Sequence, residues 1–166
     1  MFMFRGAWLI DPWAFARTSG RRFGAMDLAE LSRLSGSVAL PDGVFDVSAT
    51  GSVAEDGHSY INVKASGKIW LTCQRCLDPI LHVVRHEVLF QLWRTGEALP
   101  GDELLEDGFD ALPAGNELDL AQLIEDEVLL GLPLSPRHAD CQVPHSVSGA
   151  ADSSSFDMLK KLRRPH

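Results

Sequence analysis

The sequence has few cysteines, no long apolar run and no export signal. Its 166 residues include 3 cysteines, an odd number that does not suit a disulfide framework. No window approaches the roughly 18 uninterrupted apolar residues that a membrane-spanning helix needs. The apolar opening MFMFRGAWLI contains a single Arg, lacks a small-residue cleavage site and runs directly into Asp11-Pro12, so we expect an early strand there. These absences predict a reduced, cytoplasmic protein that does not enter a membrane.

Basic residues are absent from one long interval. No Lys or Arg lies between Arg94 and Arg137, and this interval holds 11 Asp and Glu residues. The net charge of -8 excludes a protein that coats nucleic acid by bulk electrostatics, because phosphate binding depends on Lys and Arg. The rest of the chain is mildly basic, so one face of the protein is able to meet RNA while another repels it.

The length and the pattern of apolar residues predict one α+β domain. A chain of this size buries roughly 70% of its unfolded surface, so residues 1–148 are sufficient for one core. Alternation with a period of two predicts strands over 44–54, 60–72 and 80–93, with the side from Ile61 to Leu71 buried. The fold class is an antiparallel β-sheet or partly closed barrel. A helix over 119–131, begun by Asp119 and ended by Gly131, packs on the sheet, and a short N-terminal helix runs from Asp27 to Gly36.

Two segments do not fit this core. Residues 95–117 combine acids, Gly and Pro with scattered apolar residues, which predicts a flexible acidic loop. Residues 149–166 form a short amphipathic, basic C-terminal tail in which Phe156, Leu159 and Leu162 are spaced by three. A helix of about eight residues does not hold alone, so the tail needs a surface to dock on.

Four residues are candidates for a zinc site. Cys73 and Cys76 form a C-x-x-C pair at the tip of the expected hairpin, and His138 and Cys141 form a second pair about 60 residues on. Pairs of N or S donors separated by two to four residues are typical of structural zinc. The alternative is that the thiols are buried or without a role and that His138 lies on the surface. A redox pair is less consistent with the sequence, because a β-run and no helix follows Cys76.

One face of the 60–72 strand is a candidate RNA-binding surface. Positive charges for phosphates alternate there with rings on which unpaired bases stack. Arg75 at the tip and Arg85 on the return strand extend this face, whose own residues are Tyr60, Asn62, Lys64, Lys68 and Trp70. The alternative is that a helix or the C-terminal tail covers Trp70 and Tyr60 and that the lysines are only solvated.

No catalytic motif is present. The chain has no P-loop, no G-x-G-x-x-G and no nucleophile elbow, so we expect a binding protein and no small-molecule substrate. The helix over 119–131 carries a run of acids, Glu125, Asp126 and Glu127, which is a candidate partner-binding rim. A solvated helix face explains the same run.

Three segments resemble the YceD family of bacterial proteins linked to accumulation of large-subunit ribosomal RNA: LTCQRCLDPI, LDLAQLIEDEVLLGLPLSPRHADC and SSFDMLKKL. The order and spacing match from about residue 40 to residue 162. This resemblance implies a non-enzymatic role in synthesis, processing or stability of 23S ribosomal RNA. Some relatives have more cysteines in the terminal segment. This chain has only Cys141 there, so His138 is the candidate for the fourth ligand.

Three functions follow from these observations. The first is an rRNA-stability or ribosome-assembly factor that touches RNA. The second is a zinc-stapled adaptor that binds a basic ribosomal protein and touches no RNA, since Lys- and Arg-rich proteins are attracted to the acidic loop and rim. The third is a metal- or thiol-dependent enzyme, which requires a cleft with perturbed acids.

Overall fold

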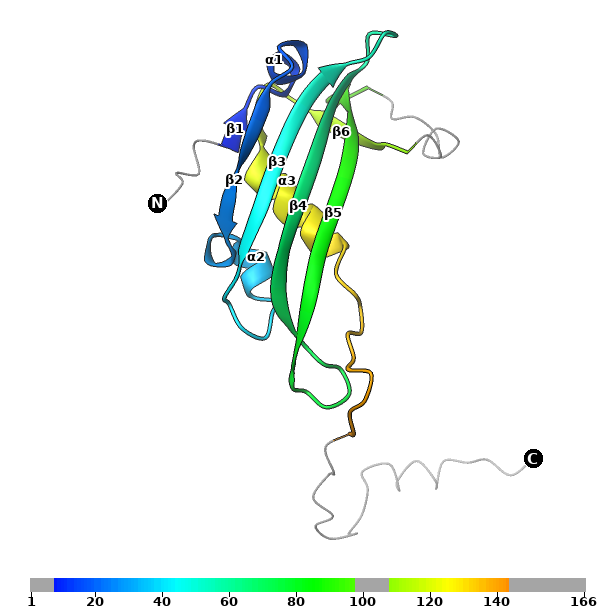
Figure 1. Ribbon diagram of the computed structural model, residues 1–166. Helices are drawn as coiled ribbons and strands as arrows, with labels where there is room; N and C mark the ends of the chain where they lie inside the picture. The colour runs from blue at the N-terminus through cyan, green and yellow to red at the C-terminus, as the bar shows by residue number, and fades with distance from the viewer. Residues whose placement is uncertain (1–7, 98–107, 144–166) are drawn as a thin grey trace, which may run out of the picture.

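Five strands form one open sheet in this computed structural model, which describes residues 8–97 and 108–143 (Figure 1). The sheet order is β2-β3-β4-β5-β6, and neighbours are antiparallel except for the parallel pair of β5 and β6. The strands are β2 (Arg21–Asp27), β3 (Val44–Val53), β4 (Ser59–Thr72), β5 (Pro79–Arg94) and β6 (Asp110–Ala114). The α+β class is confirmed, and the sheet is open and not closed into a barrel.

The β4–β5 hairpin confirms the predicted register. The predicted strands over 44–54, 60–72 and 80–93 agree with β3, β4 and β5 to within one residue at each end. On β4 the buried side chains are the odd-numbered apolar ones, Ile61, Val63, Ala65, Ile69 and Leu71. The even-numbered side chains face the other way, because successive residues of a strand point to opposite faces. One face of the sheet therefore belongs to the core.

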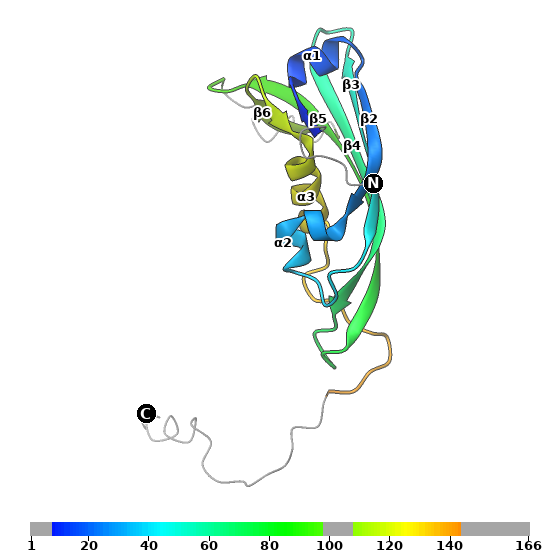
Figure 2. The same cartoon turned by 90° about the vertical axis from the view of Figure 1, so that its left-hand side faces the viewer.

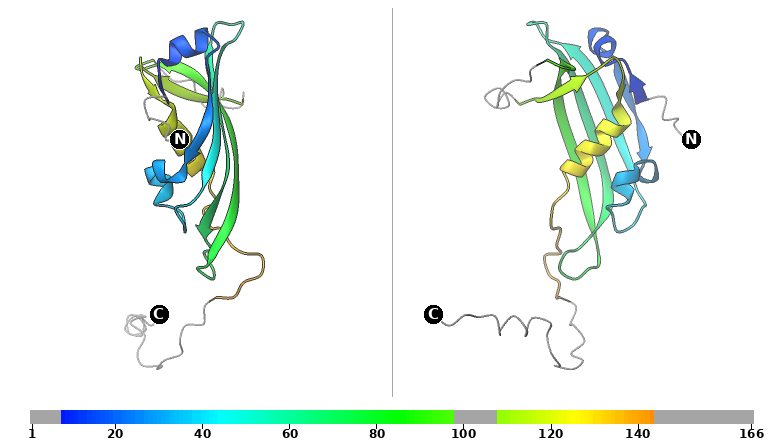
Figure 3. Two further views of the ribbon diagram at one scale, coloured as in Figure 1. Left: turned by 60° about the vertical axis from the view of Figure 1, so that its left-hand side comes forward. Right: turned by 180° about the vertical axis from the view of Figure 1, so that it is seen from behind.

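All helices of the described residues lie on that inner face, and Figure 2 shows the opposite face of the sheet without a helix. These helices are α1 (Pro12–Arg17), α2 (Ser32–Ser35) and α3 (Leu120–Leu130), seen over the sheet in the right-hand view of Figure 3. Helix α1 approaches β3 so closely that a Cβ on Gly51 would lie 2.5 Å from the carbonyl oxygen of Phe15. We call the uncovered side, which carries the even-numbered residues of β4, the outer face.

The helix over 119–131 is confirmed as α3. Asp119 begins it, and its carboxylate accepts hydrogen bonds from the backbone N–H groups of Ala121 (2.9 Å) and Gln122 (3.2 Å). Gly131 ends it, and Leu120, Ile124 and Val128 enter the core. Just before α3, β7 (Leu118–Asp119) pairs with β1 (Leu9–Ile10), which places a strand in the apolar opening of the chain as expected. No helix in the described residues is long and apolar enough to span a membrane.

The predicted helix from Asp27 to Gly36 is wrong as a continuous element. Residues Leu28–Glu30 form a 3-10 turn, and α2 begins only at Ser32. Leu31 separates them in a non-helical conformation with φ -94° and ψ 83°. Leu28, Leu31 and Leu34 are all buried. Their spacing of three residues is also typical of a helix, but here the three side chains belong to two short turns that pack against the core.

Part of the predicted acidic loop is a strand. Asp110–Ala114 forms β6, which pairs with the end of β5 and places Leu112 beside Leu92. Ala114 is buried and Leu112 packs against the core, so a short apolar pattern within an acidic stretch was sufficient for a strand. Residues 98–107 of that loop and the whole predicted tail, 149–166, lie outside the described residues.

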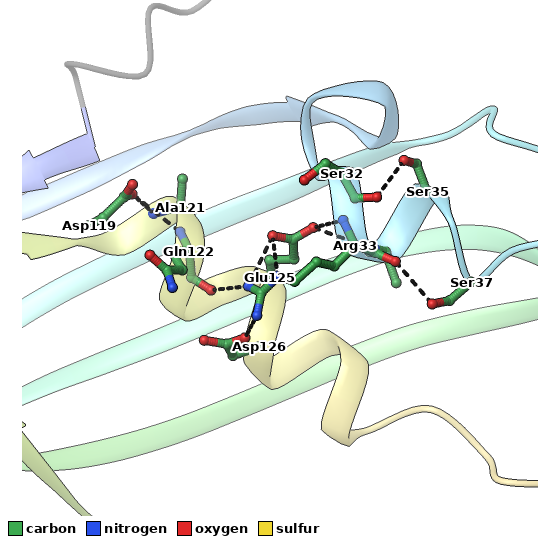
Figure 4. Close-up of polar contacts among 10 residues, drawn as sticks. Ser32, Arg33, Ser35, Ser37, Asp119, Ala121, Gln122, Glu125 and Asp126 are labelled. Carbon is green, nitrogen blue, oxygen red and sulfur yellow. Dashed lines mark hydrogen bonds and ion pairs between the residues drawn. The ribbon is translucent and has the colours of Figure 1, made fainter.

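A buried carboxylate joins α3 to α2. Glu125 on α3 accepts a hydrogen bond from the backbone N–H of Arg33 at 2.7 Å (Figure 4) and one from the backbone N–H of Leu34 at 3.1 Å. Helix α2 has no side-chain cap of its own, so Glu125 caps it from another element. The guanidinium of Arg33 also donates to the carboxylate of Glu125 at 3.0 Å and forms an ion pair with Asp126.

Replacing Glu125 removes this connection. Glu125→Ala leaves two inward-facing backbone N–H groups and Arg33 without their acceptor, so we expect the free energy of unfolding to fall by about 3 kcal/mol. Asp126→Ala removes only an exposed ion pair and should cost less than about 1 kcal/mol. Urea denaturation of both variants measures the two values. Equal losses would contradict the role given to Glu125.

The same carboxylate makes stability depend on pH. Burial raises the pKa of Glu125, but the N–H groups of Leu34 and Arg33 together with the Arg33 guanidinium outweigh it and hold the pKa below its usual value. The ionised group therefore stabilises the fold fully above about pH 4.3, and this contribution is lost as the pH falls through the lower folded-state pKa. The stability difference between the wild-type protein and Glu125→Gln should narrow below about pH 4.3 in denaturation curves. A difference that stays constant down to about pH 3 would contradict it.

Candidate metal centre and binding surfaces

The C-x-x-C pair lies in the turn that joins β4 to β5. Cys73 directly follows β4 and is fully buried, and Cys76 lies three residues before β5. The turn is closed by two backbone hydrogen bonds, from Cys73 N to the Asp78 carbonyl and from Leu77 N to the Cys73 carbonyl, both 2.9 Å. Both thiols are thereby presented from a fixed turn at the end of a rigid hairpin.

The segment after α3 brings the second pair to the same place. From Gly131 the chain runs beside the lower part of β5 to the hairpin tip (Figures 1 and 3). The backbone N–H of Gln74 donates to the Pro136 carbonyl at 2.8 Å, which fixes this segment against the turn. Two residues later, His138 enters the cluster, and Cys141 follows it. The predicted convergence of these residues is confirmed, since their donor atoms all lie within 4.8 Å of one another.

The donor spacing fits a tetrahedral metal ion. Cys73 Sγ lies 3.7 Å from Cys141 Sγ, and Cys76 Sγ lies 3.3 Å from His138 Nδ1. Two sulfurs bound tetrahedrally at about 2.3 Å from one ion are about 3.8 Å apart. Three thiols and one imidazole at these distances are therefore able to hold one metal ion.

The surroundings of the thiols favour a thiolate at Cys73. Burial raises the pKa of Cys73, but the backbone N–H groups of Cys76, His138 and Arg75 donate to its sulfur and bring the pKa down to about 5. For Cys76, the Asp78 N–H lowers the pKa, while burial and the neighbouring sulfurs of Cys73 and Cys141 outweigh it and raise the pKa to about 11. The thiolate is the form of cysteine that binds a metal ion. A bound cation also reduces the electrostatic repulsion among three neighbouring sulfurs.

Arg75 supports this cluster from within the turn. Its Nε donates to Cys141 Sγ at 2.9 Å, and its terminal nitrogen donates to the carbonyls of His138 (2.8 Å) and Ala139 (3.1 Å). The Cys141 sulfur raises the pKa of Arg75. The sequence predicted that Arg75 belongs to the RNA-binding face, whereas its guanidinium is turned towards the segment from His138 to Cys141. The C-x-x-C motif alone did not predict this supporting role.

The outer face carries most of the other residues that the sequence predicted to bind RNA. The β4–β5 register places on this side the exposed side chains of Lys64, Lys68, Trp70 and Arg85. The predicted alternative, in which a helix covers Trp70, does not hold for α1, α2 or α3, because all three lie on the inner face. Tyr60 is half-buried and its ring meets Phe109 edge-on, with 5.9 Å between ring centroids. It lies at the far end of β4 from Trp70.

One cation of this face is already neutralised. Lys64 forms an ion pair with Glu87 across the β4–β5 ladder, with 2.8 Å between Nζ and Oε1, and Asn62 donates to the same oxygen at 3.1 Å. Lys64 and Asn62 together hold the pKa of Glu87 below its usual value. Lys68 and Arg85 have no acidic partner among residues 8–97 and 108–143. The outer face is therefore less positive than its basic residues alone suggested.

The acidic run on α3 is not the exposed rim that the sequence predicted. Glu125 and Glu127 are buried, and only Asp126 is substantially exposed. Glu127 pairs with His86 on the inner face of β5 at 3.1 Å, and Glu125 caps α2. The helix face that carries them packs on the sheet and on α2, so these carboxylates are used within the fold. His86 on β5 is one of their partners.

Comparison with known proteins agrees with the motifs. The family model described as Large ribosomal RNA subunit accumulation protein YceD matches residues 61–163, which include most of β4, all of β5 and α3, and the four residues of the Cys-His cluster. No solved structure matches the chain. The match covers well over half of the sequence, and the chain therefore belongs to the YceD family.

Proposed function

We propose that the protein is a non-enzymatic, cytoplasmic factor in the synthesis, processing or stability of 23S ribosomal RNA during assembly of the large ribosomal subunit. The observation that carries this proposal is the outer face, where a broad sheet surface presents Trp70 and several apolar and basic side chains that no described helix covers. A surface of this kind binds macromolecules, and the family description supplies the process.

Two modes of action fit this surface. In the first, Trp70 stacks on an unpaired base of the rRNA while Lys68 and Arg85 contact phosphates. In the second, the protein is an adaptor that binds a basic ribosomal protein without touching RNA. Neutralisation of Lys64 by Glu87 and the inward turn of Arg75 favour the adaptor, because both remove positive charge from the face.

We further propose that the Cys-His cluster holds Zn²⁺. Zinc accepts thiolate and imidazole ligands in a four-coordinate tetrahedron, which matches the donors and spacing of Cys73, Cys76, His138 and Cys141. With all four positions taken by protein, such an ion is structural. Cys73 and Cys76 would then be joined to the segment after α3 independently of the hydrogen bonds of Arg75.

Elemental analysis tests the zinc site. Protein purified without chelator should contain about one zinc per chain, and Cys73→Ser or His138→Gln should remove it and lower the melting temperature, because metal binding energy is folding energy. His82→Gln is the matched control, since His82 lies on β5 outside the cluster and should keep the metal. Zinc far below one per chain in the wild-type protein would contradict the site.

Complementation tests the function. Deleting the gene should lower the ratio of 23S to 16S rRNA in its host, and wild-type protein should restore it. The double variant Trp70→Ser, Val83→Ser should fail to restore the ratio at equal protein levels, because it removes outer-face side chains without entering the core. Glu55→Gln, in the exposed turn at the other end of β4, is the control and should restore it. An unchanged ratio in the deletion strain would refute the function.

Salt dependence of rRNA binding separates the two modes. If the protein binds RNA directly, Lys68→Ala with Arg85→Ala should weaken binding of a 23S rRNA fragment. The double variant should also flatten the log-log salt dependence by about two units, because each cation that binds a phosphate adds about one unit to the slope. Lys64→Ala should change this slope less, since Glu87 already neutralises Lys64. Filter binding at several salt concentrations measures the slopes. Identical slopes for the wild-type protein and the double variant would contradict direct RNA binding by this face and favour the adaptor mode.

A further inference from the structure

The end of the outer face nearest the β4–β5 turn carries five exposed apolar side chains in two neighbouring rows. Leu40 pairs with Trp70, and Trp70 pairs with Leu81, which forms one row across the sheet. In the next row Lys68 pairs with Val83, and Val44 lies on its other side, one residue before the Phe45–Gly67 pair. The apolar members of these rows are 36% to 56% exposed. We call this set, Leu40, Val44, Trp70, Leu81 and Val83, the apolar end.

Such an arrangement differs from ordinary exposed apolar residues. Single apolar side chains are common on protein surfaces, whereas contiguous apolar patches mark interaction sites. Phe23 supplies the contrast within this protein, since it is 82% exposed on the same face but lies near polar neighbours on β3. In the apolar end, adjacent strands bring five apolar side chains together in register.

Leu77 adds a second, independent observation at the same end of the molecule. Its φ of +67° lies in the left-handed region that favours glycine, and its side chain is 65% exposed. The turn that presents the Cys-His cluster requires this conformation, but it does not require a leucine. A strained backbone and a solvated apolar side chain are both unfavourable, so a bulky residue at this position indicates a contact with another molecule.

The charges around the apolar end select the kind of partner. Two cations, Lys68 and Arg85, lie in or beside it. A third, Arg75, lies in the flanking hairpin turn, where its guanidinium is bound to Cys141 and His138. The exposed carboxylates in the same rows or in the turns that flank them are Asp27, Asp42, Asp46 and Asp78. An excess of negative charge around an apolar centre disfavours the phosphates of RNA and attracts a cationic protein.

We propose that the apolar end and Leu77 form the docking site for an apolar segment of a basic protein, flanked by Lys or Arg in that partner. This inference rests on the proposed function and deepens it, since a basic protein component of the large subunit is a partner of this chemistry. It moves the adaptor's contact from the acidic run on α3, which is used within the fold, to the opposite side of the sheet.

Binding of identified ribosomal proteins tests this site. Proteins extracted from large subunits of the host, separated, identified one by one and immobilised, are probed with the full-length protein after RNase treatment. At least one basic protein should bind, and Leu81→Ser with Val83→Ser should weaken that binding by about tenfold or more. Leu77→Gly should weaken it as well, while its melting temperature stays equal to or rises above that of the wild-type protein, because glycine relieves the strained conformation. Phe23→Ser is the matched control and should bind as the wild-type protein does.

Several outcomes would overturn the proposal. These are the absence of any bound ribosomal protein, equal binding by all variants, and a patch that instead mediates self-association in sedimentation or binding of naked rRNA. Measurements of 23S rRNA in cells distinguish a wrong docking site from a wrong proposed function. If the deletion strain has normal 23S rRNA, the function is wrong whatever the binding data show. If Leu81→Ser with Val83→Ser restores 23S rRNA and binds as tightly as the wild-type protein, the function stands and the docking site is wrong.

Discussion

The fold depends on the burial of one side of β4. Fourteen residues alternate along this strand with the odd-numbered side chains in the core, and β3 and β5 pair with it on either side. A shift of one residue would exchange the two faces, so the register fixes which side the helices cover and which side chains remain for a partner. The inner face supplies stability, and the outer face is the surface that we assign to recognition.

Two sets of contacts join elements that lie far apart in the sequence. Glu125 connects α3 to the N-terminal third of the chain by capping α2, and the Cys-His cluster connects the segment after α3 to the hairpin tip. Both use polar groups that are costly to bury alone and stabilising when matched. Leu77 directly follows Cys76, and Trp70 lies three residues before Cys73. A metal ion bound by the Cys-His cluster would therefore also stabilise the turn next to the surface that we assign to a partner.

The sequence predicted what depends on local pattern. The strands β3 to β5, the buried side of β4 and the cap of α3 at Asp119 follow from periodicity and capping rules, and the convergence of the Cys-His cluster follows from its paired spacing. The predicted acidic rim was wrong for Glu125 and Glu127, because a run of acids does not reveal that Arg33 and His86 approach it from other elements. The role of Arg75 depends on the segment after α3 in the same way. Helix α1 was missed although Asp11 and Pro12 form a usual helix start.

We propose that this YceD family member acts on the large subunit through the outer face of its sheet. Hydroxyl-radical footprinting of the protein, free and bound to immature large-subunit particles, tests it most directly. We predict that Trp70, Leu77 and Leu81 become protected on binding while the exposed residues of the helical side, such as Arg33 and Leu130, stay accessible. Protection of the helical side with the outer face unchanged would contradict the claim.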